Sequence, residues 1–252
     1  MKLTSMISAA AVCAALAMVS CSRNPEPVTI TVSETAALAQ GREDSLRIDI
    51  SAQYPGFKAG SKTGLAITSA ITGMLFGEDY MSLEPDAAAT AYADSLIEEY
   101  RAENLPMLDM EELAGAQMSW DDITEGKIAY TKDNMLSYIA DKYMYRGGAH
   151  GISSRYACNF DLRTGKQISE EDFFRKGYDG ELTALLTSHL EESLPSPEDM
   201  DMLFVQEIEP NGNFYLSDKG VTYIYNHYEI APYSMGIIEV TVPWDELGDL
   251  RK

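Results

Sequence analysis

The segment that most constrains the fold is glycine-rich and runs Tyr145-Arg146-Gly147-Gly148-Ala149-His150-Gly151. Strand-like sequence enters and leaves it, over residues 135–145 and 154–162. Glycine accepts positive φ angles and lets another backbone or a ligand approach closely. Three glycines around one histidine therefore predict a tight, specified bend, and the C-terminal half of the chain is expected to be arranged around it.

Hydrophobic periodicity predicts further strands and helices. Alternation at period two indicates strands, whereas apolar residues three or four apart indicate helices. Strands are expected over residues 46–51, 127–131, 135–145, 154–162, 213–216, 221–226 and 237–242, and helices over residues 63–76, 86–103, 169–174 and from 179. Strands, then helices, then strands again predict an α+β fold with mainly antiparallel sheets and packed helices. A small N-terminal α+β part is expected to precede a larger α+β domain.

Two segments have the spacing of a capping box, in which a serine and an acid three residues later each bond the other's backbone amide. They are Ser169 with Asp172 and Ser196 with Asp199. The second pair, with a proline between its members, predicts a helix that continues through Phe204.

The N-terminus has the pattern of a bacterial lipoprotein signal. Lys2 precedes an apolar run over residues 6–19, and Cys21 follows a small residue. The run is too short for a comfortable membrane span. Residues 1–20 are therefore expected to be removed, Cys21 to be lipidated, and residues 21–27 to form a tether. The alternative is an ordinary secretory signal. The expected location is the cell envelope, on the periplasmic side of the outer membrane, with the Cys21 lipid as the only membrane contact.

The chain is strongly acidic, with a formal net charge of −21 at pH 7. Such a charge disfavours nucleic-acid phosphates and anionic headgroups as partners and favours cationic ones. The alternative is that acidity only keeps the protein soluble.

Cysteine and histidine usage argues against a disulfide, a metal or a cofactor. If Cys13 is lost with the signal and Cys21 is lipidated, Cys158 is the one remaining thiol. It falls on the apolar face of its strand, which predicts a buried and unreactive side chain. His150, His189 and His227 match no zinc-binding spacing.

The candidate binding residues are His150 and Gly148 in the bend, with Tyr228, Glu229 and Tyr233 in a later loop. Histidine titrates near neutral pH and can serve as base, ligand or hydrogen-bond donor. Its alternative role is structural, by bonding backbone carbonyls of the glycine turn. The tyrosines offer amphipathic rings for a protein partner or for stacking on sugars, or they pack the corner against the turn.

Several motifs in one order resemble a known family. They are the glycine cluster, Phe160-Asp161-Leu162, Thr164-Gly165-Lys166, the segment Ser169–Phe174, Asn213-Phe214-Tyr215 and residues 225–236. Residues from about 125 to 250 resemble the extracytoplasmic domain shared by the anti-sigma factor RsiV and the peptidoglycan deacetylase PdaC. Residues 28–118 resemble the companion domain that precedes it, so the expected domains are residues 28–118 and 119–252.

The resemblance implies a non-enzymatic binding module of the cell envelope. Its expected ligand is either a cationic envelope protein such as a lysozyme-like muramidase, or peptidoglycan. The alternative is a glycan-modifying enzyme that uses His150 with a carboxylate such as Glu229 or Asp161, although no catalytic motif accompanies the histidine. A structural subunit of an envelope complex is a third hypothesis.

Overall fold

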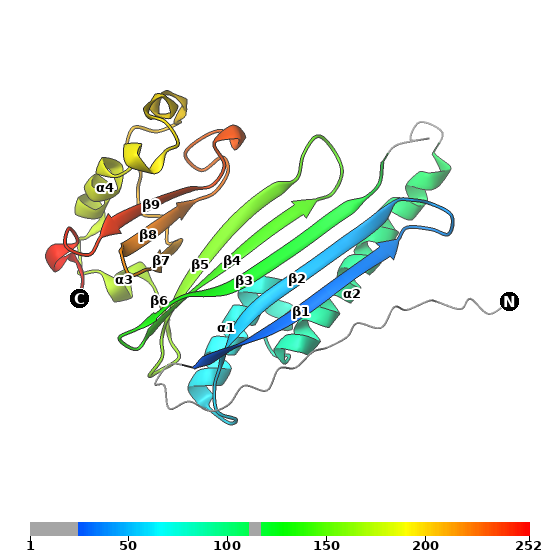
Figure 1. Ribbon diagram of the computed structural model, residues 1–252, viewed down its shortest axis with the longest axis horizontal. Coiled ribbons are helices and arrows are strands. Elements are labelled where there is room, and N and C mark those ends of the chain that lie inside the picture. The colour runs from blue at the N-terminus through cyan, green and yellow to red at the C-terminus, as the bar shows by residue number, and fades with distance from the viewer. Residues whose placement is uncertain (1–24, 111–116) are drawn as a thin grey trace.

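The computed structural model describes residues 25–110 and 117–252 (Figure 1). The predicted signal sequence and Cys21 lie outside the described residues. The first part of the fold is a six-stranded sheet in the order β1-β2-β3-β4-β5-β6, with two helices on one face. Its elements are β1 (Glu26–Ala37), β2 (Ser45–Gly56), α1 (Lys62–Phe76), η1 (Glu78–Tyr80), α2 (Pro85–Asn104), η2 (Leu105–Asp109), β3 (Trp120–Lys132), β4 (Met135–Tyr145), β5 (Ile152–Asp161) and β6 (Gln167–Ile168).

The second part is a three-stranded antiparallel sheet in the order β7-β8-β9, with short helices around it. Its elements are α3 (Glu170–Phe173), α4 (Asp179–Ser188), η4 (Glu191–Ser193), η5 (Pro197–Met202), β7 (Phe214–Leu216), β8 (Gly220–Tyr225), η6 (Tyr233–Met235), β9 (Ile238–Pro243) and η7 (Gly248–Leu250). The mixed composition and mainly antiparallel pairing confirm the predicted α+β class.

The two helices lie in the one crossover connection that the six-stranded sheet requires. β2 and β3 pair in parallel, from Leu46 opposite Trp120 to Ala52 opposite Gly126. Parallel strands cannot be joined by a tight turn, so the connection must cross one face of the sheet. α1 and α2 form this crossover and cover that face (Figure 1).

The start of α1 and its apolar stripe follow from the sequence. The Ser61 hydroxyl accepts a hydrogen bond from the Gly64 amide at 3.0 Å and so caps the helix. Ile67, Ile71 and Leu75 recur at helical spacing and are completely buried. They pack in a first hydrophobic cluster with residues of β2, α2, β4 and β5.

β1 is not among the strands expected from periodicity, and it begins within the segment expected to be a tether. It pairs with β2 alone, so it is an edge strand. Within it only Ile30 and Ala36 are buried. The sequence nevertheless alternates here, with apolar residues at 28, 30 and 32 and polar residues at 29, 31 and 33, so the signal for this strand was present and its omission is a wrong prediction.

The predicted capping boxes are both present. Ser169 with Asp172 begins α3, and Ser196 with Asp199 begins η5. The second element is a 3₁₀ helix that ends at Met202, so the predicted continuation through Phe204 is wrong. The chain is extended at Leu203, where η5 ends.

The six-stranded sheet runs across the expected domain boundary at residues 118 and 119. β2 lies before this boundary and β3 after it, and the two strands pair directly. The first hydrophobic cluster includes residues from Ile30 to Phe160, and a second cluster extends from Tyr130 to Leu250. The six-stranded sheet therefore separates the two hydrophobic cores, and its strands β3, β4 and β5 lie between them.

Side chains of the second sheet take the place of a neighbouring strand along β5. β5 pairs with β4 on one side and with the short β6 only near its C-terminal end. The Asn226 carboxamide accepts a hydrogen bond from the Arg155 amide at 2.7 Å and donates one to the Arg155 carbonyl at 3.0 Å. The Asn213 carboxamide donates to the same carbonyl at 2.9 Å and accepts from the Ala157 amide at 2.8 Å. These bonds satisfy backbone groups that an edge strand would otherwise leave open.

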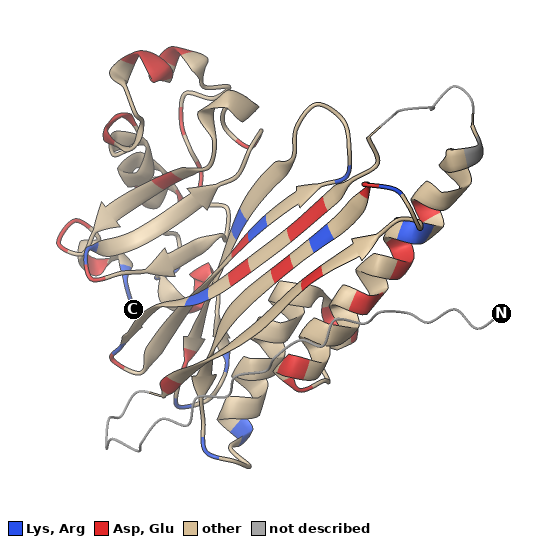
Figure 2. Cartoon of the chain, turned by 45° about the vertical axis from the view of Figure 1, so that its right-hand side comes forward, with Lys and Arg blue, Asp and Glu red and all other residues tan. Residues whose placement is uncertain are grey.

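The open face of the six-stranded sheet is charged, and its charges are paired across strands. Figure 2 shows acidic and basic residues side by side on it. Arg47 lies 3.0 Å from Asp121, and Lys127 lies 3.4 Å from Asp141. Arg155 bridges to the second sheet through Glu239, at 2.9 Å.

No helix of the described residues is long and apolar enough to cross a membrane.

Candidate functional site

The predicted bend joins β4 to β5 as a loop over residues 146–151. Gly147 and Gly148 both have φ of +92°, which glycine adopts without steric cost. No heavy atom lies within 4 Å of a Cβ built on either residue, so the backbone conformation, rather than crowding, requires glycine. The Gly148 carbonyl accepts a hydrogen bond from the Tyr145 hydroxyl at 3.0 Å, which closes the loop.

His150 contacts the loop backbone and the ring of Tyr233. Its Nδ1 lies 3.0 Å from the Gly151 carbonyl oxygen. Because a carbonyl can only accept, Nδ1 carries the hydrogen. The imidazole stacks on Tyr233 at a centroid distance of 4.1 Å, and the Tyr233 hydroxyl donates to the same carbonyl at 2.7 Å. The structure thus shows the turn-fixing contact expected of His150, while the side chain remains exposed.

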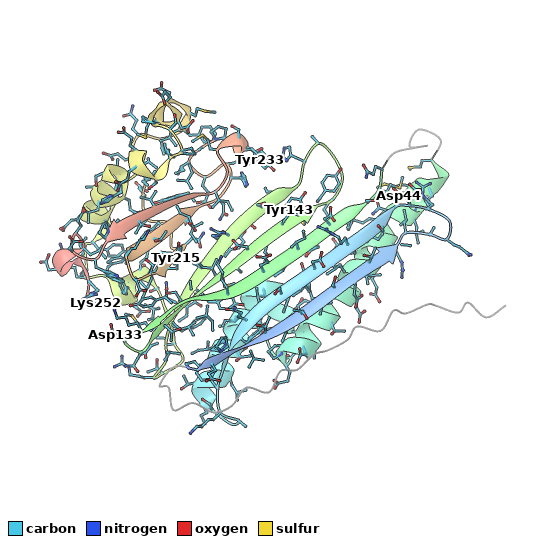
Figure 3. All side chains as sticks on the ribbon, in the orientation of Figure 1. Asp44, Asp133, Tyr143, Tyr215, Tyr233 and Lys252 are labelled. Atoms are coloured by element: carbon cyan, nitrogen blue, oxygen red, sulfur yellow. The ribbon has the colours of Figure 1, made fainter. Side chains whose placement is uncertain are left out.

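Tyr233 connects the loop after β8 to this bend. Figure 3 shows it at η6, on the side toward the β4–β5 hairpin. His227 stacks on it at 4.4 Å, and the His227 Nδ1 lies 3.2 Å from the Tyr233 carbonyl oxygen. Two imidazoles and a phenol therefore form one stacked group. His227 was not among the predicted site residues, although its position next to Tyr228 in the same loop was an available signal.

Tyr228 is the most exposed aromatic ring of the loop. The residue is 55 % exposed, and its ring centroid lies 6.0 Å from that of Tyr233. Its φ of +69° lies in the left-handed region, which is uncommon for a bulky residue. Its amide donates to the Ala231 carbonyl at 3.1 Å, so the turn is fixed by a hydrogen bond and presents the ring outward.

Glu229 does not join this stacked group. Its carboxylate accepts a hydrogen bond from the Asn211 side chain at 2.9 Å. Asp161, the other acid considered beside His150, binds Arg163 and lies at the far end of β5. At about 3.3 Å per residue, the ten residues of β5 place it roughly 30 Å from the bend. His150 and Asp161 therefore cannot act on the same bond.

An apolar segment after η5 lies beside the same loop. The Phe204 amide donates to the Ile230 carbonyl at 2.9 Å. Met202, Phe204 and Val205 are 42 %, 58 % and 39 % exposed. We call His150, Met202, Phe204, Val205, His227, Tyr228 and Tyr233 together the loop surface. The apolar part contributed by residues 202–205 was not predicted, because that stretch was expected to be helical.

The segment that supplies Phe204 is acidic throughout. Between Lys176 and Lys219 the chain has no lysine or arginine, but it has the acids Asp179, Glu181, Glu191, Glu192, Glu198, Asp199, Asp201, Glu207, Glu209 and Asp218. One histidine in this segment, His189, lies between Glu192 and Glu246 and is mostly buried. In the described part of the chain, no cluster of three or more histidine, cysteine or acidic side chains is placed to hold a metal ion.

Two family models match this chain. The model of the deacetylase PdaC matches residues 42–153, and that of a protein family of unknown function, DUF3298, matches residues 171–245. Together the two matches correspond to a PdaC–DUF3298 domain pair of unknown function. The PdaC match covers β2 to the β4–β5 bend, and the DUF3298 match covers α3 to β9, so the loop surface takes residues from both.

Two crystal structures of DUF3298 family proteins resemble this PdaC–DUF3298 pair. The first, from Bacteroides fragilis, has a TM-score of 0.81 and 29% sequence identity, with 90% of this chain and 94% of that chain covered. The second, from Pseudomonas aeruginosa, has a TM-score of 0.66 and 19% identity, with the same coverage, and so supports the fold alone. No curated protein matches the chain.

Proposed function

We propose that this protein is a non-enzymatic binding protein of the cell envelope, anchored through a lipid on Cys21, that recognises a basic, lysozyme-like muramidase. The observation that carries the proposal is the loop surface beside an acidic segment. Aromatic and aliphatic side chains stand exposed on loops held by hydrogen bonds, and the chain between Lys176 and Lys219, which supplies Met202, Phe204 and Val205, has acidic residues but no lysine or arginine. A fixed aromatic patch with a charged surround is the usual form of a protein-recognition site.

The acidic segment supports a basic partner on physical grounds. Negative charge near the contact steers a cationic protein and raises its association rate, whereas the buried aromatic contacts slow its dissociation. Tyr228 and Phe204 are the expected anchors, since each exposes more than half of a large ring side chain. The stacked rings of His150, Tyr233 and His227 would hold the loop in its binding conformation.

The test is calorimetric titration of the purified protein with lysozyme, at low and at moderate salt. We expect saturable one-to-one binding that exceeds binding of an unrelated protein of equal positive charge and that persists at moderate salt. Tyr228→Ala should weaken binding at least tenfold, as expected when a central aromatic anchor is removed. Leu65→Ala is the matched control, because Leu65 is 59 % exposed on α1, away from the loops, and should bind as the parent does.

Three outcomes would contradict the proposal. If the unrelated basic protein binds as tightly as lysozyme and both lose binding at moderate salt, the acidic segment serves only solubility. Tyr228-dependent binding to isolated peptidoglycan, without binding to lysozyme, would assign the surface to glycan. Turnover of peptidoglycan that is abolished by His150→Ala, with folding intact, would make the protein an enzyme.

A further inference from the structure

A cavity of about 590 Å³ lies where α1 and α2 leave the sheet uncovered. Its floor is the helix-facing side of β3, β4 and β5, and Met74 of α1 and Tyr92 of α2 form one wall. The loop surface lies on other elements and contributes none of its residues to the lining. The volume is within the usual range of small-molecule sites, roughly 300–1,000 Å³.

The strand register places three hydrogen-bonding side chains in one row on the cavity floor. Thr124 of β3 pairs with Lys142 of β4, and Lys142 pairs with Ser154 of β5. Directly opposed residues of adjacent strands have Cβ atoms about 4.5–5.5 Å apart. An ammonium group is therefore flanked by two hydroxyls, and all three line the cavity.

None of these three side chains has a hydrogen-bond or ion-pair partner among the described residues. Thr124 is 1 % exposed, and its hydroxyl is buried without a partner. A buried hydroxyl left without a hydrogen bond costs about 1–3 kcal/mol, so such groups normally have a function or a bound partner. Lys142 is partly buried, and desolvation lowers its pKa, although the Asp122 charge opposes this.

The nearby carboxylate has partners of its own. Asp122 is 5 % exposed and receives the Tyr92 hydroxyl at 3.3 Å. The Arg146 guanidinium lies 3.6 Å from it and also stacks over the Trp120 ring at 4.2 Å. Asp122 lines the cavity, and Arg146, which also lies 3.8 Å from Glu99, is its ion-pair partner. Lys142 feels the Asp122 charge but makes no ion pair within 4 Å among the described residues, so its ammonium is the cavity cation without a direct partner.

The mouth of the cavity is apolar. Met144, Ile152 and Tyr156 line it and are 40 %, 42 % and 45 % exposed. They occupy the rows on either side of Lys142, since Met144 pairs with Ile152 and Tyr156 pairs with Ala140. Deeper in the cavity, Cys158 and Met74 contact each other through sulfur, at 3.3 Å. A cationic, hydroxyl-rich floor therefore adjoins flexible apolar walls.

From this juxtaposition we propose that the cavity binds a small anionic amphiphile. Its acidic head accepts hydrogen bonds from Lys142, Thr124 and Ser154. Its alkyl chain packs against Met74, Met144 and Ile152. A carboxylate or a phosphate on a medium-length alkyl chain has this chemistry. A cationic head would face the unpaired ammonium and is rejected, and a neutral head leaves that ammonium without a counter-charge.

The test is calorimetric titration of the purified protein with decanoate and decyl phosphate, below the concentrations at which they form micelles. We expect one-to-one binding of at least one of the two, with decanol at least tenfold weaker and decyltrimethylammonium without detectable binding. If only decanoate binds, the head group is a carboxylate; if only decyl phosphate binds, it is a phosphate.

Lys142→Met is the deciding variant, and Lys127→Met is its matched control. Lys127 lies on the neighbouring strand, bound to Asp141 outside the cavity, so its loss should leave affinity unchanged. Lys142→Met should reduce affinity at least tenfold without lowering the melting temperature, because it replaces an unpaired, partly buried charge with an apolar group. Equal affinity of decanol and decanoate, unchanged affinity in Lys142→Met, or no binding of either anion would overturn the proposal.

This inference stands independently of the proposed function. Tyr228→Ala should bind decanoate as the parent does, and Lys142→Met should bind lysozyme as the parent does. Loss of both activities in either single variant would show that the cavity is not a separate site.

Discussion

Removing the carboxamide of Asn226 should destabilise the protein through one strand edge. The side chain accepts from the Arg155 amide at 2.7 Å and donates to the Arg155 carbonyl at 3.0 Å. In Asn226→Ala the carbonyl keeps its bond from Asn213, at 2.9 Å, but the amide loses its acceptor. An unsatisfied, partly buried amide costs about 1–3 kcal/mol, and we expect the free energy of unfolding to fall by about 2 kcal/mol.

Urea unfolding followed by circular dichroism measures this change, and melting temperature provides a second measure. For a protein of this size, about 2 kcal/mol corresponds to a decrease of roughly 4–8 °C. A change below about 0.5 kcal/mol in Asn226→Ala would refute the reasoning, because water would then satisfy the edge as well as the asparagine does.

Three further predictions concern titration, reactivity and packing. Burial lowers the pKa of His189, but its hydrogen bonds to two glutamates outweigh this and leave the pKa raised. The protonated histidine therefore stabilises the fold fully below its ordinary pKa of about 6.5, and this stabilisation is lost as the pH rises through the raised value. In parallel urea titrations, His189→Gln should destabilise the protein at pH 5.5 and hardly at pH 9. Burial raises the pKa of Cys158 to about 12, so the thiolate that reacts with iodoacetamide is scarce in the native protein. Mass spectrometry of the Cys158 peptide should show modification at least a hundredfold slower in native than in denatured protein, and comparable rates would show that the thiol is accessible. A Cβ at Gly126 would lie 2.0 Å from the Tyr138 hydroxyl, so Gly126→Ala should cost about 1–3 kcal/mol in thermal unfolding, and adding Tyr138→Phe should restore most of it; no rescue would mean that another contact requires the glycine.

The fold was largely predictable because its signals are local. The Ser61 hydroxyl caps α1 by accepting a hydrogen bond from the Gly64 amide three residues later, and Ser169 with Asp172 caps α3 over the same distance in sequence. The alternation around Cys158 correctly predicted a buried thiol. β1 was not predicted, although apolar residues at 28, 30 and 32 alternate with polar ones and carry the period-two signal of a strand.

The contacts between distant segments were not predictable, because they depend on strand register. Nothing local indicates that Thr124, Lys142 and Ser154 form one row, since this follows from two pairings across three strands. One signal was present nevertheless. Lys142 continues the alternation of Leu136, Tyr138 and Ala140, whose side chains are buried, so a charged residue stands on an apolar face. A cationic interruption of that kind indicates a cavity or a partner.

The asparagine contacts along β5 also determine where a partner can extend the sheet. An incoming peptide that adds a strand needs free amides and carbonyls in register. At Arg155 and Ala157 these groups are already bonded to Asn213 and Asn226. The opposite edge, β1, has one such side-chain contact among the described residues, a long one of 3.5 Å from Arg101 to the carbonyl of its last residue, Ala37, and Pro27 contributes no amide to it. Recognition by strand addition to this sheet is therefore directed to β1, beside the N-terminal end of the fold and away from the loop surface.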